Sequence, residues 1–209
     1  MGVVPVNGHT HMVGGLLIGA ALAPVLRESG GHLIPWLAAA ALAAPLPDLD
    51  HPASMYGRFL PLPGVAKVSG CLEPYVPGPF GNGGQTFGHV GRRTPFGVLW
   101  HRGPLHSILM ATAFGAAAFL AASHFAPALD VTVGLGVLLG YLSHLALDEL
   151  NVAGEHLLWP LVGRELGLPW PSVRVGSVGE ATLFAAMSLA AAALLSPHLG
   201  FPALAVFRP

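Results

Sequence analysis

The hydrophobic positions of the chain form five runs, separated by turns in which polar residues, glycine and proline gather. A helix needs about 20 apolar residues to cross a bilayer, and the last three runs approach that length. The first two are shorter, and form either full spans with their flanking residues or a buried helical hairpin. The runs are residues 12–26, 33–46, a segment from Ser107 to about 126, 131–150 and 178–195.

Composition points the same way as the pattern. The chain is 53% hydrophobic and only 9% charged, whereas an ordinary soluble domain carries about 25% charged residues. A chain this short cannot hide so much apolar surface from water. We therefore expect an all-α, polytopic helical membrane protein. Residues 1–209 would form a single membrane-embedded domain with about five transmembrane or membrane-embedded helices.

A long connection, residues 52–100, separates the second run from the third. It contains many prolines and the glycine-rich segment 81–84, which argue against regular structure. Loops of this length are usually functional or disordered. We expect it to lie on the cytoplasmic side as a lid over the site described below.

Charge and cysteine content exclude several classes of function. The net charge is −1, and without a basic tail there is no direct signal for nucleic-acid binding. A single cysteine, Cys71, excludes an internal disulfide framework and a multi-cysteine zinc site. Histidines (11) outnumber lysines and arginines together (9). Because the few carboxylates cluster beside histidines, this composition suggests a metal centre.

The fourth run carries the clearest candidate ligands. His144 and Asp148 are four residues apart, so on a helix they share one face. Imidazole and carboxylate are a common metal-ligand pair; the alternative is a hydrogen-bonded pair that pins two helices together. Gly136 and Gly140 lie on the same face and would let a neighbouring helix approach closely.

A second motif follows the second run. Asp48, Asp50 and His51 lie between prolines, which make the segment a rigid, non-helical corner. His11 lies at the entrance to the first run and adds another imidazole.

A third motif precedes the third run. Pro104 suits the first turn of a helix, so we expect His106 within that turn and His101 just before it, beside Arg102. Asp130 is the expected N-cap of the fourth helix.

Five helices bring these motifs to one membrane face, because the first and third helices leave that face while the second and fourth return to it. The same face holds seven of the nine lysines and arginines, so the positive-inside rule makes it cytoplasmic. The seven are Arg58, Lys67, Arg92, Arg93, Arg102, Arg164 and Arg174; Arg27 and Arg208 lie on the other side.

The candidate ligands outnumber the three or four that one zinc ion needs, so two ions bridged by an aspartate are expected. Mixed histidine and carboxylate ligands suit zinc, manganese or iron, with zinc the first expectation. Two such ions would polarise a phosphate and deprotonate a water. Asp48 or Asp50 would bridge the ions or accept the proton, with Asp50 the candidate catalytic residue, and Arg102 would hold a phosphate oxygen. The candidate ligands are His11, Asp48, Asp50, His51, His101, His106, His144 and Asp148.

Other polar and aromatic residues receive structural interpretations. Glu149 points away from the Asp148 face and should be solvated or paired with a basic residue. Glu180 either pairs with an arginine or reaches the site. The tryptophans are expected to anchor the membrane interface; they are Trp36, Trp100, Trp159 and Trp170.

Four segments together resemble the YdjM-type family of membrane-bound, metal-dependent hydrolases, also described as LexA-binding inner-membrane proteins. They are THMVGG (10–15), LPDLDH (46–51), HRGPLHS (101–107) and GYLSHLALDELNVAGEHLLWP (140–160). The resemblance implies that the eight candidate residues form the family's metal site. Leu105 and Asn151 stand where threonine is frequent in the family, so a supporting hydroxyl is expected to be missing.

The leading hypothesis is an inner-membrane, multi-pass, metal-dependent hydrolase whose site faces the cytoplasm. It would cleave a phosphoester bond in a lipid or lipid-linked phosphate, in a phospholipase-like reaction. The rivals are a metal or proton transporter, and a structural or regulatory protein whose metal site holds helices together. The lipid bilayer is the expected partner, while a cytoplasmic regulatory partner and a homo-oligomer stay open.

Overall fold

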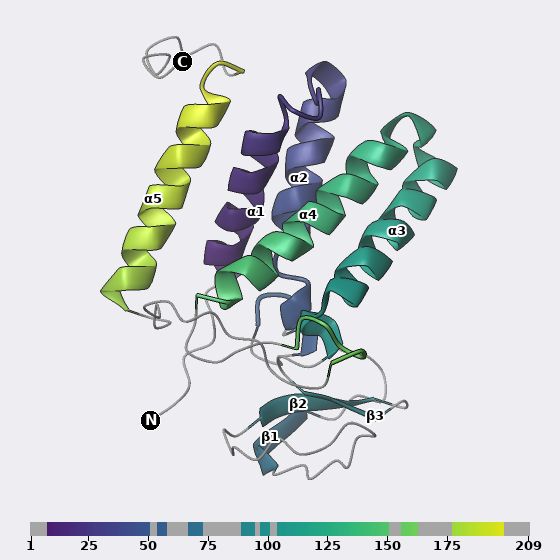
Figure 1. Cartoon of the computed structure of the whole chain (residues 1–209), viewed down its shortest axis with the longest axis vertical. Coiled ribbons are helices and arrows are strands. Elements are labelled where there is room, and N and C mark those ends of the chain that lie inside the picture. The colour runs from purple at the N-terminus through teal and green to yellow at the C-terminus, as the bar shows by residue number, and fades with distance from the viewer. Residues whose placement is uncertain are drawn as a thin grey trace.

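The computed structural model describes residues 8–50, 54–57, 104–150, 156–162 and 177–198, together with the backbone of three strands between 67 and 100. Its core is a bundle of helices (Figure 1), which confirms the expected helical membrane fold. The α-helices are α1 (Gly8–Leu22), α2 (Leu33–Ala43), α3 (Ile108–Phe125), α4 (Asp130–Asp148) and α5 (Val178–Leu195), and the 3-10 turns are η1 (Gly30–His32), η2 (Pro47–Asp50), η3 (Pro104–His106) and η4 (Pro127–Leu129).

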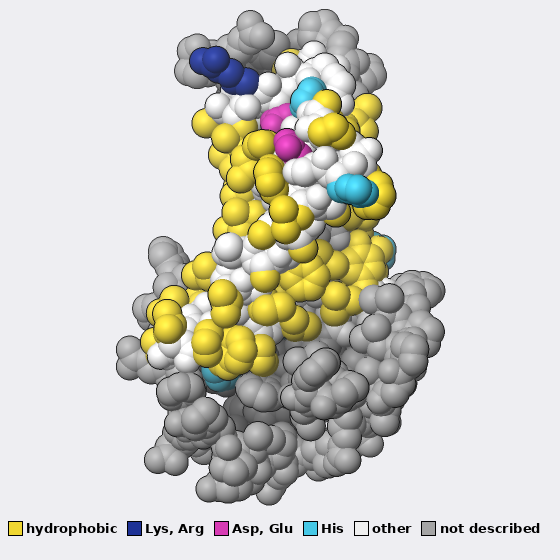
Figure 2. Space-filling view, turned by 90° about the vertical axis from the view of Figure 1, so that its right-hand side faces the viewer, with side chains coloured by type: hydrophobic (Ala, Val, Ile, Leu, Met, Phe, Trp, Pro, Cys, Tyr) yellow, Lys and Arg dark blue, Asp and Glu magenta, His cyan; other side chains and the backbone are white. Residues whose placement is uncertain are grey.

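Three of the described helical segments are long and apolar enough to cross a membrane: Ile108–Phe125, Pro127–Asp148 and Val178–Leu195. Only 11% of the first and of the last is buried inside the protein, as expected for helices that face lipid. The face with α3 toward the viewer is correspondingly covered by hydrophobic side chains over its middle (Figure 2).

α4 is the central helix. It packs against α1, α2 and α3, while α2 also packs against α1, and α5 packs against α1 at one side of the bundle (Figure 1). α1 and α5 begin at the same end of the bundle at which α2 and α4 finish and α3 starts. The described helices therefore alternate in direction as the sequence predicts, with these five helix ends at one end of the bundle.

Glycines on α1 and α4 let three helices meet at Ala40 of α2. A Cβ added at Gly140 would overlap the Ala40 carbonyl and lie 2.8 Å from its Cα, and one added at Gly15 would overlap the same carbonyl oxygen. A Cβ at Gly136 would lie 3.1 Å from the Trp36 carbonyl oxygen. The expected close approach at Gly136 and Gly140 is thus confirmed, with α2 as the neighbour.

Trp36 belongs to this contact and not to the membrane interface, so that expectation was wrong. Its side chain is fully buried, and its indole N–H donates to the Gly19 carbonyl oxygen at 2.7 Å. The hydrogen bond lets the indole occupy the interior without leaving a buried donor unpaired.

Two helix starts differ from the expected ones. Ser107 is the N-cap of α3, so Pro104 and His106 lie in the preceding turn η3 and not in the first turn of the helix. The N-cap of α4 is Leu129, and Asp130 is the first helical residue. The Asp130 carboxylate accepts hydrogen bonds from the Val131 N–H at 2.6 Å and the Ser123 hydroxyl at 3.3 Å.

The long connection contains a sheet that the sequence analysis did not expect. β1 (Lys67–Leu72), β2 (His89–Thr94) and β3 (Gly97–Trp100) form an antiparallel sheet in the order β1-β2-β3. All prolines of the connection lie outside these strands, so they interrupt the pairing without preventing it. The sheet lies beyond the end of the bundle where α1 begins (Figure 1); its role as a lid stays a prediction.

Replacing Gly140 with alanine should destabilise the bundle by about 2–3 kcal/mol, because backbone atoms of α2 cannot move aside as a side chain could. Thermal unfolding of the detergent-solubilised protein would measure this as a lower midpoint. Gly31→Ala is the control, since a Cβ there meets no atom within 4 Å. Equal midpoints for the two variants would show that α2 and α4 are not in tight contact at Gly140.

Candidate metal centre

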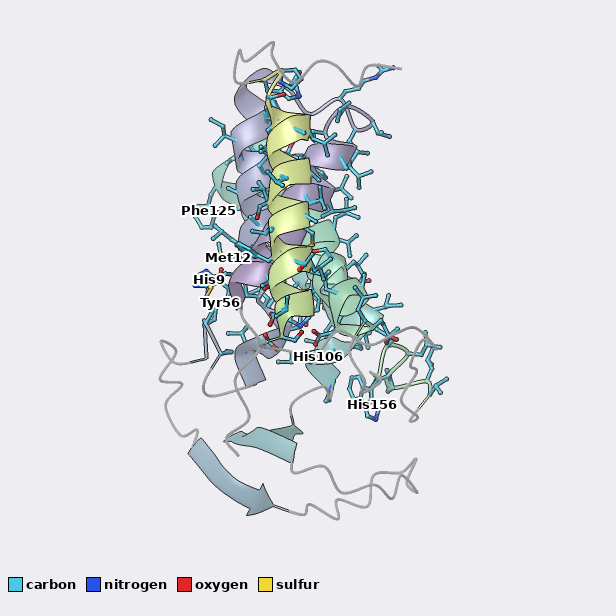
Figure 3. The ribbon with its side chains drawn as sticks, turned by 90° about the vertical axis from the view of Figure 1, so that its left-hand side faces the viewer. His9, Met12, Tyr56, His106, Phe125 and His156 are labelled. Atoms are coloured by element: carbon cyan, nitrogen blue, oxygen red, sulfur yellow. The ribbon has the colours of Figure 1, made fainter. Side chains whose placement is uncertain are left out.

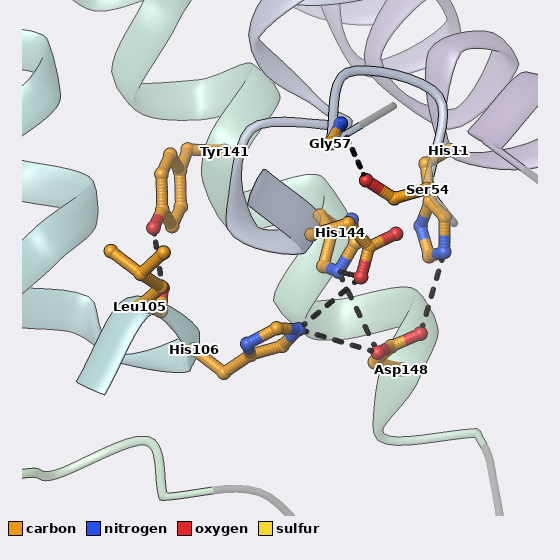
Figure 4. A network of polar contacts seen from close by, with 9 residues as sticks. His11, Ser54, Gly57, Leu105, His106, Tyr141, His144 and Asp148 are labelled. Atoms are coloured by element: carbon orange, nitrogen blue, oxygen red, sulfur yellow. Dashed lines mark hydrogen bonds and ion pairs between the residues drawn. The ribbon is translucent and has the colours of Figure 1, made fainter. Parts of the chain in front are cut away.

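Five of the eight candidate ligands come together at the end of the bundle where α1 begins and α4 finishes (Figure 4). Their side chains are almost completely hidden from solvent, with residue exposures of 3% or less. Because these residues lie far apart in sequence, only the helix arrangement places them side by side. The five are His11, Asp48, His106, His144 and Asp148.

The five candidate ligands lie on four separate segments. His11 lies near the start of α1, Asp48 lies in η2, and His106 ends η3. His144 and Asp148 occupy the last turns of α4 on its buried face. The two prolines that flank the start of η2, Pro45 and Pro47, are fully buried, which fixes the corner that carries Asp48.

Four side-chain atoms, two imidazole nitrogens and two carboxylate oxygens, lie near one another and are called the four-atom set below. Asp48 Oδ1 lies 3.6 Å from His106 Nε2 and 3.7 Å from His144 Nε2, and Asp148 Oδ2 lies 3.9 Å and 3.6 Å from the same two nitrogens. These distances are too long for hydrogen bonds. Ligands of a tetrahedral zinc ion, each about 2.0–2.2 Å from it, are about 3.3–3.6 Å apart. Two groups of three have the size that a metal ion requires: ligand atoms of Asp48, His106 and His144 all lie within 4.8 Å of one another, and so do those of His11, His144 and Asp148.

His11 extends the site beyond this set. Its Nε2 lies 3.4 Å from Asp148 Oδ1, the carboxylate oxygen that the four-atom set does not use. Its ring stacks on the His144 ring, with centroids 3.8 Å apart and an interplanar angle of 25°. Asp148 thus directs one oxygen to each side, as a carboxylate shared between two neighbouring ions would.

The burial of these groups fits a cation. Two carboxylates with little access to water are costly unless they are paired or coordinate a metal. Within the described part of the chain, neither ring nitrogen of the buried His11 has a hydrogen-bond partner. A divalent ion would satisfy both kinds of group, because neutral imidazole and carboxylate donate lone pairs to it.

Tyr141 and Ser107 support the segment that carries His106, and the sequence analysis assigned no role to either. The buried Tyr141 hydroxyl donates to the Leu105 carbonyl oxygen, one residue before the ligand. The Ser107 hydroxyl donates to the Pro104 carbonyl at 2.7 Å and accepts from the Met110 N–H at 3.3 Å. A serine immediately before an apolar run is a common N-cap signal, whereas nothing in the sequence marks Tyr141.

Two glutamates lie near the candidate ligands. Glu149 follows Asp148 in the sequence, and Glu180 contacts the residue that precedes His11. Glu149 is buried, with 6% exposure, so of its two expected states the solvated one is wrong, and pairing with a basic residue stays a prediction. Glu180 of α5 accepts a hydrogen bond from the Thr10 hydroxyl at 3.1 Å. This bond ties α5 to α1 at the residue before His11.

The segment 54–57 packs against the start of α1 and the end of α2. The Tyr56 hydroxyl donates to the Leu42 carbonyl oxygen at 2.8 Å, and partial burial raises the pKa of that tyrosine. A Cβ at Gly8 would lie 2.9 Å from the Met55 Cβ. These contacts hold the described part of the long connection close to the ligand-bearing helix ends.

The remaining predicted residues lie outside the described part: the side chain of Asp50, and His51, His101 and Arg102 entirely. His9 is exposed and points away from the bundle, in contrast to His106 at its lower end (Figure 3). The role of the five clustered residues as ligands stays a prediction, which the geometry makes specific.

Comparison with known proteins identifies the same family by a family model and by individual relatives. Residues 6–207 match the family model described as YdjM inner membrane protein. The chain is 33% identical over 144 residues to "Inner membrane protein YdjM" of Escherichia coli (strain K12), covering 68% of this chain and 56% of that protein; the Shigella flexneri protein of the same name gives the same figures. It is 29% identical over 190 residues to "Uncharacterized protein YvsG" of Bacillus subtilis (strain 168), covering 88% of this chain and 91% of that one. No solved structure matches significantly.

The matched region spans a little more than half of the Escherichia coli relative, so the whole relative's activity is not carried over to this chain. The family match, by contrast, extends over nearly all of this chain, and it includes each of the five clustered residues. The resemblance inferred from the four motifs is thereby confirmed, and the chain belongs to the YdjM inner membrane protein family.

Proposed function

We propose that the protein is a metal-dependent hydrolase that cleaves a phosphoester bond of a lipid or lipid-linked phosphate at the cytoplasmic face of the inner membrane. The observation that carries the proposal is the four-atom set of two imidazole nitrogens and two carboxylate oxygens, with N–O separations of 3.6–3.9 Å. It is buried at one end of an apolar bundle, and imidazoles and carboxylates gathered in this way are a common ligand set for a divalent cation.

Hydrolysis is supported by the groups beyond that set. One ion needs at most four protein ligands, and a fully ligated zinc site is typically structural. His11 and the second oxygen of Asp148 lie outside the set, 3.4 Å apart, and would hold a second ion with fewer protein ligands. A divalent ion in such a position polarises a phosphoryl oxygen and lowers the pKa of a bound water.

The chain's own residues would orient and balance the charge of this centre. Asp48 and Asp148 together offset the charge of one divalent ion. We propose that Asp50 accepts a proton or bridges the ions and that Arg102 holds a phosphate oxygen, as the sequence suggested. The stacked His11 and His144 rings keep the two halves of the site in contact.

A lipid substrate is supported by the depth of the centre. Asp148 is the last residue of the apolar segment Pro127–Asp148, and His106 lies two residues before the segment Ile108–Phe125. The candidate ligands therefore lie at the ends of segments that are long and apolar enough to cross a membrane. In a bilayer these ends would lie at the level of the lipid headgroups. We propose that the helices cross the membrane several times and that this end faces the cytoplasm, on the basis of the lysine and arginine distribution.

The buried face of α4 favours hydrolysis over transport. Between Thr132 and Tyr141 its buried residues are Gly134, Gly136 and Gly140, which pack against neighbouring helices and present no polar side chain. A transporter would instead be expected to continue its polar groups through the bundle.

Elemental analysis of the purified protein should find up to about two divalent ions per chain, as a two-metal site requires. His11→Ala should remove only the second ion, because the four-atom set stays complete, whereas His144→Ala should remove both. His124→Ala is the matched control, since that exposed side chain lies near the opposite end of α3. Full metal content in His144→Ala would reject the centre.

Purified protein in lipid nanodiscs, loaded with zinc, manganese or iron, should release the phosphorylated headgroup or phosphate from a phospholipid. Asp148→Asn should lower the rate at least about 100-fold, because the ions lose a shared anionic ligand. Asp130→Asn, at the far end of the same helix, should leave it unchanged. Bound metal without cleavage of any phosphoester would favour a site that only holds the helices together.

Tyr141→Phe should weaken metal binding without abolishing it. The variant keeps every ligand but frees the Leu105 carbonyl, so η3 and His106 become less fixed. Loss of an outer hydrogen bond of this kind typically costs about 10–100-fold in metal affinity. Competition with a chelator would measure the change, and an unaltered affinity would show that the hydrogen bond does not position His106.

A further inference from the structure

The turn His156–Val162 presents apolar side chains that the protein does not cover. Leu161 is 86% exposed and Leu158 is 42% exposed. The described turn has the sequence HLLWPLV, without any lysine, arginine, aspartate or glutamate. An uncharged segment with exposed leucines and a tryptophan is typical of the boundary between lipid headgroups and acyl chains.

This turn is held firmly in place. Leu157 packs against the core formed by Ala111, Tyr141 and Leu145. Its carbonyl oxygen accepts a hydrogen bond from the Ile108 N–H at 3.0 Å, at the first residue of α3. Within the turn, the N–H groups of Leu161 and Val162 donate to the Leu158 carbonyl at 2.8 and 3.1 Å. The exposure of Leu161 is therefore a feature of the fold.

The exposed leucines also continue a lipid-facing surface. The turn is bonded to the start of α3, where Ile108 is 44% exposed and Leu109 is 49% exposed. α3 is long and apolar enough to cross a membrane, and only 11% of this segment is buried in the protein. Hydrophobic side chains follow this side of the molecule toward the end that carries the site (Figure 2).

We propose that the His156–Val162 turn is inserted into the bilayer leaflet next to the metal centre, with Leu158 and Leu161 among the acyl chains. The turn would enter only one leaflet, and it would set the depth of that end of the bundle in the membrane. Because Leu157 and the ligand His106 flank the same start of α3, the anchor would keep the centre at headgroup level. This placement does not depend on hydrolase activity, and its test uses none.

Site-directed spin labelling can test the insertion. Cys71 is the only cysteine, so Leu161→Cys in a Cys71→Ser background carries a single label. Leu189→Cys on α5, at a position 73% exposed in an apolar span, is the lipid reference. Ser29→Cys, in the exposed turn at the opposite end, is the water reference. Each labelled protein is reconstituted in nanodiscs and checked for a monodisperse profile and unchanged thermal midpoint.

Power saturation with oxygen and with a water-soluble nickel chelate then gives the depth of each label. The depth parameter compares the accessibility of the label to oxygen with its accessibility to the nickel chelate. Insertion predicts that the label at Leu161→Cys is more accessible to oxygen than to nickel, as at Leu189→Cys. Should Leu161→Cys fold poorly, Leu158→Cys is expected to give the same result. A label at Leu161→Cys that is more accessible to nickel than to oxygen, as expected for the water reference at Ser29→Cys, would overturn the proposal. Low access to both reagents would also overturn it, and line broadening that disappears on dilution with unlabelled protein would identify a second copy as the cover.

Discussion

The contact of three backbones at Ala40 is the constraint on which the site depends. Gly15 lies four residues after His11, and Gly140 lies four residues before His144, so each glycine is one turn from a ligand on the same helix face. Both glycines meet the Ala40 carbonyl. This contact brings α1 and α4 close enough for the two imidazoles to stack at 3.8 Å in the next layer. A larger residue at either glycine would separate the ligands before it affected any polar group directly.

The same close packing keeps water away from the charged groups, so burying them has a free-energy cost that suggests a functional role. Asp48 and Asp148 are almost fully hidden from solvent, and their distances to His106 and His144 exceed those of hydrogen bonds. An ion between the groups, as proposed above, would account for both their burial and their spacing, and the second oxygen of Asp148 would connect His11 to the same site.

The sequence could predict the convergence of the motifs because helix order alone decides which ends share a membrane face. It could also predict that Gly136, Gly140, His144 and Asp148 share a helix face, since that follows from periodicity. It could not predict the turn η3, the burial of Glu149 or the position of Trp36. These depend on tertiary contacts such as Tyr141 with Leu105 and Trp36 with Gly19, which no local pattern encodes. The strands between 67 and 100 could not be predicted from the proline content of that segment. The prolines lie outside the strands, so they mark where strand pairing ends and do not prevent it.

Depth in the membrane connects the fold to the chemistry. The ligands lie at the ends of apolar segments and not in their middle, so the charges of a metal centre need not be placed in hydrocarbon, where they would be most costly. Yet the described surface beside them, from Ile108 and Leu109 to Leu158 and Leu161, is apolar and exposed. A metal centre at this position would be shielded from bulk water on its bundle side and, with the proposed insertion of the turn, bordered by lipid on its flank. Such a site suits a substrate whose polar group stays at the membrane surface while its remainder stays in the bilayer, and suits a water-soluble substrate less well.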